Sequence, residues 1–149
     1  MNNFDRRKFL KMLGAAAAMS TLSKAINAAT TAPRVVVVGG GFGGATVAKY
    51  LRMWGGDNVQ VTLVEPNPTH YSCILSNLVV TGALGMSSIN LNYDKLKNLY
   101  GVSLLAGKAI AIDGAGNKLT VRTSTGNVVL PYDHLVLSPG IDFVPPPAG

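Results

Sequence analysis

Val35–Gly44 has the sequence VVVVGGGFGG, a run of four valines followed directly by a cluster of glycines. Consecutive β-branched residues favour a strand that is buried on both faces, as in a parallel sheet covered by helices. Gly39, Gly41 and Gly44 match the spacing G-x-G-x-x-G. In that pattern the first glycine permits a tight turn, the second admits a pyrophosphate against the backbone, and the third lets helix and strand pack closely. The stretch therefore predicts a strand, a phosphate-binding turn and a helix.

The residues that follow complete a β-α-β unit. Residues 45–54 have helical character, and residues 58–65 form a second strand that ends in an acid, Glu65. Glu65 lies 21 residues after Gly44, about where an acid binds the ribose 2′-hydroxyl of an adenosine. A cofactor with a 2′-phosphate is disfavoured, because two negative charges would meet there. We expect a Rossmann-type dinucleotide site, and the alternative is a plain buried turn.

Composition limits the partners and the metal chemistry of the chain. The 149 residues suffice for one domain with a core. Residues 1–28 hold five of the 13 basic residues and one of the seven acids, which leaves a net charge of +2 for the rest. No basic stripe with interleaved aromatics remains, so a nucleic-acid partner is not expected. Cys73 is the only cysteine, which excludes an internal disulfide and a clustered metal site.

The N-terminus has the pattern of an export signal. Residues 5–11, DRRKFLK, precede a mildly apolar stretch at 12–22 and then small residues. The pattern indicates a twin-arginine signal peptide over residues 1–28, a leader at 29–33 and a periplasmic location. The apolar stretch is shorter than the ~20 residues that cross a bilayer, so no transmembrane segment is expected in the mature chain. The alternative is a basic amphipathic helix.

The segment after the second strand is expected to be irregular and then helical. Pro66 and Pro68 disfavour regular structure over several residues. Ser72 is suited to cap a short helix that Gly82 and Gly85 end, because the apolar residues before them recur at i, i+4 spacing.

The rest of the chain departs from a simple alternation of strands and helices. A helix over 93–99 and a third parallel strand over 102–106 are followed by two extended runs, 118–123 and 128–130, joined by a turn. These runs predict a β-meander in place of a crossover helix. A further apolar strand, 132–140, ends in the small residues Ser-Pro-Gly, which permit a close approach to a cofactor.

Together these features resemble the first FAD-binding segment of the flavoproteins that carry two dinucleotide-binding domains. That superfamily includes pyridine nucleotide–disulfide reductases, type II NADH dehydrogenases and sulfide:quinone oxidoreductases. The chain is more narrowly similar to the flavoprotein subunit of flavocytochrome c sulfide dehydrogenase. That similarity is carried by residues 35–41, 43–46, 48–50, 61–67 and 71–77. The resemblance spans residues 34–142, and the segment YSCILSN at 71–77 is its most specific part.

The resemblance implies a role for the lone cysteine. In that family the cysteine of this segment is joined through its sulfur to the 8α-methyl carbon of FAD, which makes Cys73 the candidate for covalent attachment. The alternative is a free cysteine that simply packs. His70 departs from the aromatic expected in relatives, and it is either an aid to thiol deprotonation or an exposed loop histidine.

The implied cofactor-binding residues are Gly39, Gly41, Phe42, Gly43, Gly44, Glu65, Cys73, Ser76, Asn77 and Gly140. For Ser76 and Asn77, hydrogen bonding at a helix end is an equal alternative. Tyr132 and Asp133 are expected to be structural, and His134 is expected to pack or to point to solvent. No catalytic residue is expected in this chain, since the family's redox disulfide would lie downstream. No metal ligand is expected either.

The implied fold is α/β: a Rossmann-like FAD-binding domain with a parallel sheet, crossover helices and an inserted β-meander. Residues 34–142 would be its N-terminal segment, incomplete without downstream segments, and 143–149 a linker. The implied activity is FAD-dependent oxidation of sulfide to sulfur or polysulfide. A cytochrome c partner, with haem c on a separate subunit, would accept the electrons. The fragment alone is expected to be inactive.

Two other functions stay open. A sulfide:quinone oxidoreductase or a type II NADH dehydrogenase would share the fold and differ in the electron acceptor. The chain could also be a non-catalytic nucleotide-binding or assembly module. An NAD-linked short-chain dehydrogenase fits worst, because the meander and Cys73 have no place in it.

Overall fold

The computed structural model describes residues 32–141, which belong to one compact unit. The predicted signal peptide, most of the leader and the predicted linker at 143–149 lie outside the described residues.

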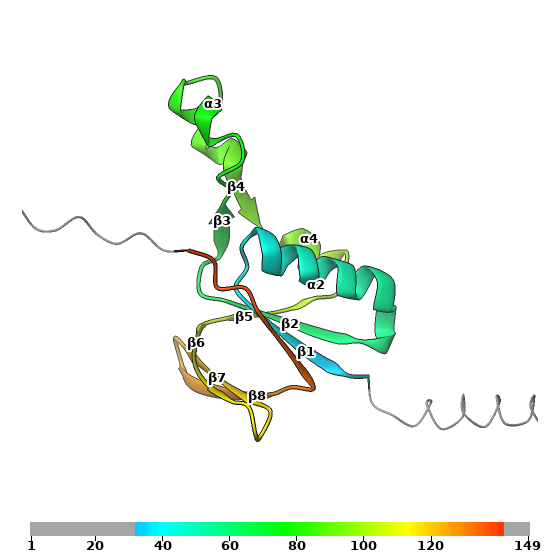
Figure 1. The fold of residues 1–149 in the computed structure, drawn as a ribbon. Helices are drawn as coiled ribbons and strands as arrows, with labels where there is room; N and C mark the ends of the chain where they lie inside the picture. Colours follow the sequence, from blue (N-terminus) through cyan, green and yellow to red (C-terminus); the bar gives the residue numbers. More distant parts are fainter. Residues whose placement is uncertain (1–31, 142–149) are drawn as a thin grey trace, which may run out of the picture. The chain divides into compact units, whose positions relative to one another are not determined.

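The centre of the fold is a four-stranded parallel sheet in the order β5-β2-β1-β9 (Figure 1). Its strands are β1 (Arg34–Val38), β2 (Gln60–Glu65), β5 (Ser103–Ala106) and β9 (His134–Leu137). All four lie at the stretches that hydrophobic patterning predicts. The last in sequence, β9, returns to pair with β1 on the side away from β2, so the strand order reverses beside β1.

Helices cover one face of this sheet. α2 (Phe42–Gly55) follows β1, a 3₁₀ turn η1 (Gly56–Asn58) ends it, and α4 (Asp94–Asn98) precedes β5. The core on this side contains Val35, Val37, Ala48, Val59, Val61, Leu63, Tyr93, Leu96 and Val102. α2 lies between β1 and β2 in the chain and packs on both, which makes it the crossover helix of the β-α-β unit.

A three-stranded antiparallel sheet covers the opposite face. It consists of β6 (Lys108–Asp113), β7 (Lys118–Thr123) and β8 (Gly126–Pro131). Val36, Val64, Leu119, Val121 and Tyr132 form the core between the two sheets. The valine run is therefore buried on both sides, with its odd-numbered members toward the helices and Val36 toward the meander. Burial of one such side chain contributes about 1.5–3 kcal/mol.

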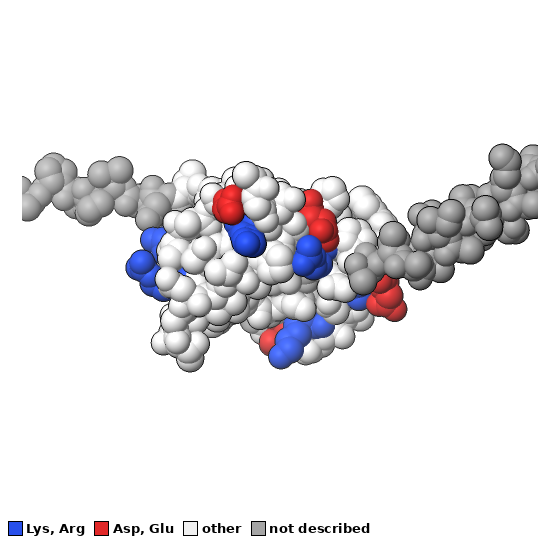
Figure 2. All heavy atoms as spheres, turned by 90° about the horizontal axis from the view of Figure 1, so that it is seen from below, with Lys and Arg blue, Asp and Glu red and all other residues white. Residues whose placement is uncertain are grey.

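The meander is confirmed, and it has one more strand than the sequence predicts. β6 follows β5 after a single residue, and its pairing with β7 shifts between Ala109 and Ala111. The shift disturbs the alternation of inward and outward side chains, which explains why patterning does not predict β6. Viewed from this side in Figure 2, charged side chains of both signs stand in small separate groups with uncharged surface between them.

An arm, residues 69–92, leaves the sheet between β2 and α4 and extends away from it (Figure 1). Its base is a two-stranded antiparallel ladder of β3 (Thr69–Tyr71) and β4 (Asn90–Asn92). Beyond the ladder lie α3 (Ser76–Val80) and a 3₁₀ turn, η2 (Met86–Ile89). No Asp, Glu, Lys or Arg occurs between residues 66 and 93.

The arm corrects two expectations. The prolines do not prevent regular structure, because β3 begins at Thr69, directly after Pro68, and pairs with a strand about twenty residues later. The short helix begins at Ser76 rather than after Ser72. The Ser72 hydroxyl instead accepts a hydrogen bond from the Ile74 N–H at 3.2 Å in a local turn. Side chain-to-backbone bonds of this kind compete with helix formation.

Candidate nucleotide-binding site

The glycine turn, residues 39–44, requires the absence of side chains at its two ends. Gly39 has φ +96°, and a Cβ there would overlap the carbonyl oxygen of Ser138. A Cβ on Gly44 would overlap the carbonyl oxygen of Gly39. The first and third glycines of the motif are therefore needed for the tight turn and for close packing of α2 on the strand.

Gly41, the second glycine of the motif, faces open space. A Cβ there would meet only His70, at 3.8 Å from the ring carbon Cε1. Gly41 is also the N-cap of α2, whose first turn contains no acidic residue and whose cap has no side-chain hydrogen bond. The Ala45 N–H donates to the Gly41 carbonyl, so the N–H groups before it point out of the helix. This geometry and the helix dipole suit a phosphate group.

Glu65 ends β2 beside the turn, and its carboxylate is held on both oxygens. Oε2 accepts a hydrogen bond from the Gly40 N–H at 2.7 Å. Oε1 accepts from the Asn67 N–H at 3.0 Å and from its side-chain amide at 2.9 Å. A carboxylate has about four acceptor positions, so these three bonds fix its orientation and leave room for a ribose hydroxyl.

Tyr93 is a member of the site that the sequence does not reveal. It is buried, and its hydroxyl donates a hydrogen bond to the Gly40 carbonyl at 3.0 Å. Burial and the nearby negative charge of Glu65 raise the pKa of Tyr93 to about 12. Helical spacing with Leu96 points Tyr93 at the core. No local signal, however, indicates a contact with a turn 53 residues earlier.

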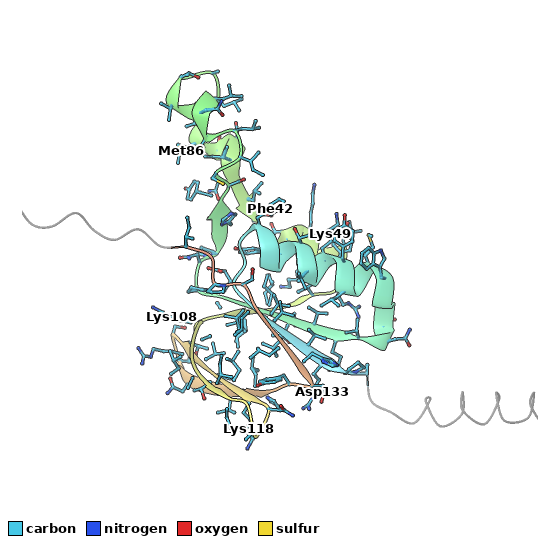
Figure 3. The ribbon with its side chains drawn as sticks, viewed as in Figure 1. Phe42, Lys49, Met86, Lys108, Lys118 and Asp133 are labelled. Atoms are coloured by element: carbon cyan, nitrogen blue, oxygen red, sulfur yellow. The ribbon has the colours of Figure 1, made fainter. Side chains whose placement is uncertain are left out.

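Two cavities, each of about 230 Å³, flank Tyr93. The first lies between the glycine turn, α2 and the arm, and its lining includes Gly41, Phe42, Lys49, His70 and Leu91. Figure 3 shows Phe42 at the start of α2 and Lys49 further along the same helix. The second lies at the ends of β2 and β5, and its lining includes Glu65, Asn67, Asp94 and Ala106. The second cavity has the acid and the position expected for an adenosine.

His70 is not an exposed loop residue. It belongs to β3, is half-buried and lines the first cavity close to Gly41. The expectation of a solvated loop histidine is therefore wrong, because β3 places this side chain against the turn.

Cys73 lies on the arm, two residues after β3, and is exposed. The backbone around it is ordered by hydrogen bonds from the Ser72 N–H to Ile89 O at 2.9 Å and from the Ser76 N–H to Cys73 O at 3.2 Å. The alternative of a cysteine that packs in the core is not what the structure shows. Ser76 and Asn77 form the first turn of α3 and are exposed as well.

The turn after β9 packs on the glycine turn. The Ser138 N–H donates to Val38 O at 2.9 Å, and a Cβ on Gly43 would lie 2.8 Å from the Ser138 hydroxyl. Gly140 has φ +74° and no atom within 4 Å of its Cβ position. This turn therefore reaches the edge of the sheet where the first-turn amides of α2 lie.

Asp133 has a structural role at the opposite end of the sheet. Its carboxylate accepts hydrogen bonds from the Arg34 backbone N–H at 2.7 Å and from the Arg34 guanidinium at 3.0 and 3.1 Å. The guanidinium bonds, followed by the backbone bond, lower the pKa of Asp133 from 3.8 to about 2. The pair joins the starts of β1 and β9, far along the strand from the glycine turn (Figure 3).

The structure thus brings the glycine turn, Glu65 and the Ser138–Gly140 turn together, while Cys73, Ser76 and Asn77 lie on the arm. Within residues 32–141 no group of three His, Cys, Asp or Glu is placed to hold a metal ion. In the same range no helix is long and apolar enough to cross a membrane.

A parallel sheet with a glycine turn at the point where strand order reverses defines a Rossmann-type dinucleotide-binding domain. Comparison with known proteins assigns the family. Residues 33–148 match the pyridine nucleotide-disulphide oxidoreductase model, and the chain belongs to this family of flavoprotein oxidoreductases.

Three relatives illustrate the match. The flavoprotein chain of a sulfide dehydrogenase [flavocytochrome c] from Chlorobaculum thiosulfatiphilum is 59% identical over 46 residues, 31% of this chain and 94% of that sequence. The type II NADH:quinone oxidoreductase NdhA of Mycobacterium tuberculosis is 34% identical over 111 residues, 72% of this chain and 22% of that protein. The sulfide:quinone oxidoreductase structure from Aquifex aeolicus superposes with TM-score 0.64 at 26% identity, covering 76% of this chain and 25% of that one.

Proposed function

We propose that this chain is the FAD-binding N-terminal part of a periplasmic sulfide dehydrogenase that oxidises sulfide to sulfur or polysulfide. The observation that carries the substrate class is the 59% identity to a sulfide dehydrogenase flavoprotein chain. The chain spans about a quarter or less of the length of the other two relatives. Sulfide oxidation is therefore proposed for the whole protein to which this chain belongs.

The residues of the site fit an adenine dinucleotide such as FAD. The first-turn amides of α2 would bind the pyrophosphate in the space that Gly41 leaves open. Glu65 would accept hydrogen bonds from the ribose hydroxyls beside the second cavity. Phe42, Gly43 and the turn at Gly140 would border the cofactor as it crosses the edge of the sheet. Bound FAD would accept two electrons from a substrate and release them one at a time.

Cys73 would join the flavin through a thioether to the 8α-methyl carbon. The thiol S–H bond and one methyl C–H bond would be broken, and the two electrons and two protons would be taken up by the oxidised flavin, which becomes reduced. Its thiol is exposed, as attachment requires. His70 borders Gly41, and Cys73 follows His70 by three residues, which is about 10 Å along an extended chain. In this proposal the arm would lead from the glycine turn toward the part of the dinucleotide that lies beyond the pyrophosphate. Ser76 and Asn77 would line the flavin from the same segment.

The electron acceptor would be a cytochrome c with haem c on a separate subunit, and export would follow the twin-arginine route. The similarity to the flavoprotein chain of a flavocytochrome c supports this acceptor. The DRRKFLK motif at residues 5–11 supports export.

Acid denaturation of the full-length protein tests the proposal directly. We expect flavin fluorescence to remain with the peptide that contains Cys73, and to be lost from that peptide in a Cys73→Ala variant that still binds FAD. A Ser72→Ala variant is the matched control and should keep the attached flavin. Release of all flavin from the wild-type protein would contradict attachment at Cys73, and a protein purified without flavin would instead favour a non-catalytic module.

A quinone-reducing enzyme is the second candidate. The match to the mycobacterial type II NADH:quinone oxidoreductase covers more of this chain than the match to the sulfide dehydrogenase does. Steady-state assays with sulfide or NADH as donor, and with a soluble quinone or oxidised cytochrome c as acceptor, separate the two. Sulfide-dependent cytochrome c reduction supports the first proposal, and reduction of quinone alone supports the second.

A further inference from the structure

Tyr93 joins two parts of the molecule that meet at the site. It follows the last residue of β4 and precedes the first residue of α4, so its backbone connects the base of the arm to the helix layer. Its side chain is 8% exposed and lies between the two cavities. The ring and hydroxyl therefore reach the glycine turn from a fixed base.

Gly40 is held from both sides by residues outside the turn. Its N–H donates to Glu65 Oε2 at 2.7 Å, and its carbonyl accepts from the Tyr93 hydroxyl at 3.0 Å. The two peptide planes that flank Gly40 are thus both oriented by hydrogen bonds. The next residue, Gly41, begins the group of amides that faces the open space.

Gly40 is also closely packed against its neighbours. A Cβ on Gly40 would lie 2.5 Å from the Tyr93 hydroxyl oxygen and 2.9 Å from Glu65 Cγ. The tyrosine occupies the volume that any side chain at this position would need, so the turn and Tyr93 are fitted to each other.

We propose that Tyr93 is a positioning residue that holds the glycine turn in the conformation that binds the pyrophosphate of the dinucleotide. The identity of the ligand rests on the proposed function, whereas the geometry of the turn does not. Without the hydroxyl, the Gly40 carbonyl loses its buried donor and the turn samples other conformations. Binding must then order the turn, which lowers affinity.

The test compares Tyr93→Phe with Tyr132→Phe in the full-length protein, in a Cys73→Ala background from which flavin can be removed. Tyr132 is a matched control, because it is 7% exposed and its hydroxyl lies 3.5 Å from Asp113 O in the meander core. We expect the FAD dissociation constant, measured by flavin fluorescence, to rise about fivefold in Tyr93→Phe and less than about twofold in Tyr132→Phe.

A second readout separates this inference from the proposed function. Without nucleotide, hydrogen exchange at the amides of residues 40–43 should be faster in Tyr93→Phe than in either the parent or Tyr132→Phe. Unchanged affinity together with unchanged exchange would overturn the positioning role. If the parent binds no FAD, the proposed function fails, and the exchange comparison alone decides the role of Tyr93.

Should Tyr93→Phe not fold, Gly40→Ala tests the same contact from the other side. The added methyl must displace the tyrosine and also presses on Glu65 Cγ, so faster exchange at residues 41–43 and weaker FAD binding are expected. Exchange and affinity equal to those of the parent would overturn the inference.

Discussion

The glycine turn and the arm show opposite ways of building a site. The turn is fixed by contacts from Glu65, Tyr93 and Ser138, and little of its backbone can change without a steric clash. The arm has no charged residue, and several of its apolar side chains are exposed: Tyr71, Ile74, Leu75, Val80, Met86 and Leu91. Figure 3 shows Met86 on this segment, away from the sheet. The glycine turn is therefore held in place by contacts among the described residues, whereas the arm presents apolar surface that the described residues leave exposed.

Gly44→Ala should give the largest loss of stability, because it places a methyl group where the backbone of the turn cannot move. The added methyl overlaps the Gly39 carbonyl oxygen, and we expect the free energy of unfolding to fall by about 3 kcal/mol or more. Urea denaturation measures this free energy. Gly114→Ala is the control, since a Cβ there meets nothing within 4 Å. Equal stability of the two variants would show that the turn is not as constrained as its geometry implies.

Leu119→Ala should be nearly as damaging, although it lies far from the turn in sequence. Leu119 is 0% exposed between the parallel sheet and the meander, and removal of its side chain leaves a cavity that costs about 2–4 kcal/mol. The same urea measurement applies. A loss below about 1 kcal/mol would mean that the meander packs more loosely on the sheet than the core cluster indicates.

The ion pair between Arg34 and Asp133 should contribute a small, pH-dependent stability. The pKa of Asp133 is lowered from 3.8 to about 2, so the contribution is present above the unfolded-state pKa and is lost as pH falls from about 4 through about 2. Asp133→Asn should lower the thermal midpoint by a few degrees at most at pH 7, since the pair is exposed. A midpoint difference that is as large at pH 2 as at pH 7 would contradict the ion pair as its source.

Val80→Ser, on the arm, should have the smallest effect. Val80 is 87% exposed, so the free energy of unfolding should change by less than about 0.5 kcal/mol. The contrast with Gly44→Ala shows the difference between the arm and the glycine turn most directly. A loss above about 1 kcal/mol would show that a neighbour covers the arm in the intact protein, and dynamic light scattering would show whether that neighbour is another copy.

The strands and helices that local patterning indicates were predicted, β9 among them, whereas the strands β3, β4 and β6 were not. The valine run, the glycine spacing and the acid at Glu65 are local signals, and the structure confirms the strands and the crossover helix that they predict. β3 pairs with β4 across about twenty residues of arm, and three residues carry too little pattern to reveal a strand. Tyr93 is similar, because its contact with Gly40 exists only in the folded chain.

The assignment of site residues follows the same division. The turn and Glu65 meet as predicted, since the carboxyl ends of β1 and β2 lie side by side in a parallel sheet. The role of Cys73 came only from a resemblance, and it stays a prediction, because no physical property of an exposed thiol on an uncharged arm specifies a flavin.

The four valines of β1 also affect how the register between β1 and its neighbouring strands is determined. Identical residues give no information about register, and a slip of two residues would return each valine to the same face of the sheet. Alignment must therefore come from the two ends of the strand, where Asp133 binds Arg34 and Ser138 packs on Gly39. These end contacts select one of several nearly equivalent pairings, so the middle of the strand is free to exchange valine for isoleucine wherever volume allows, while its ends are not.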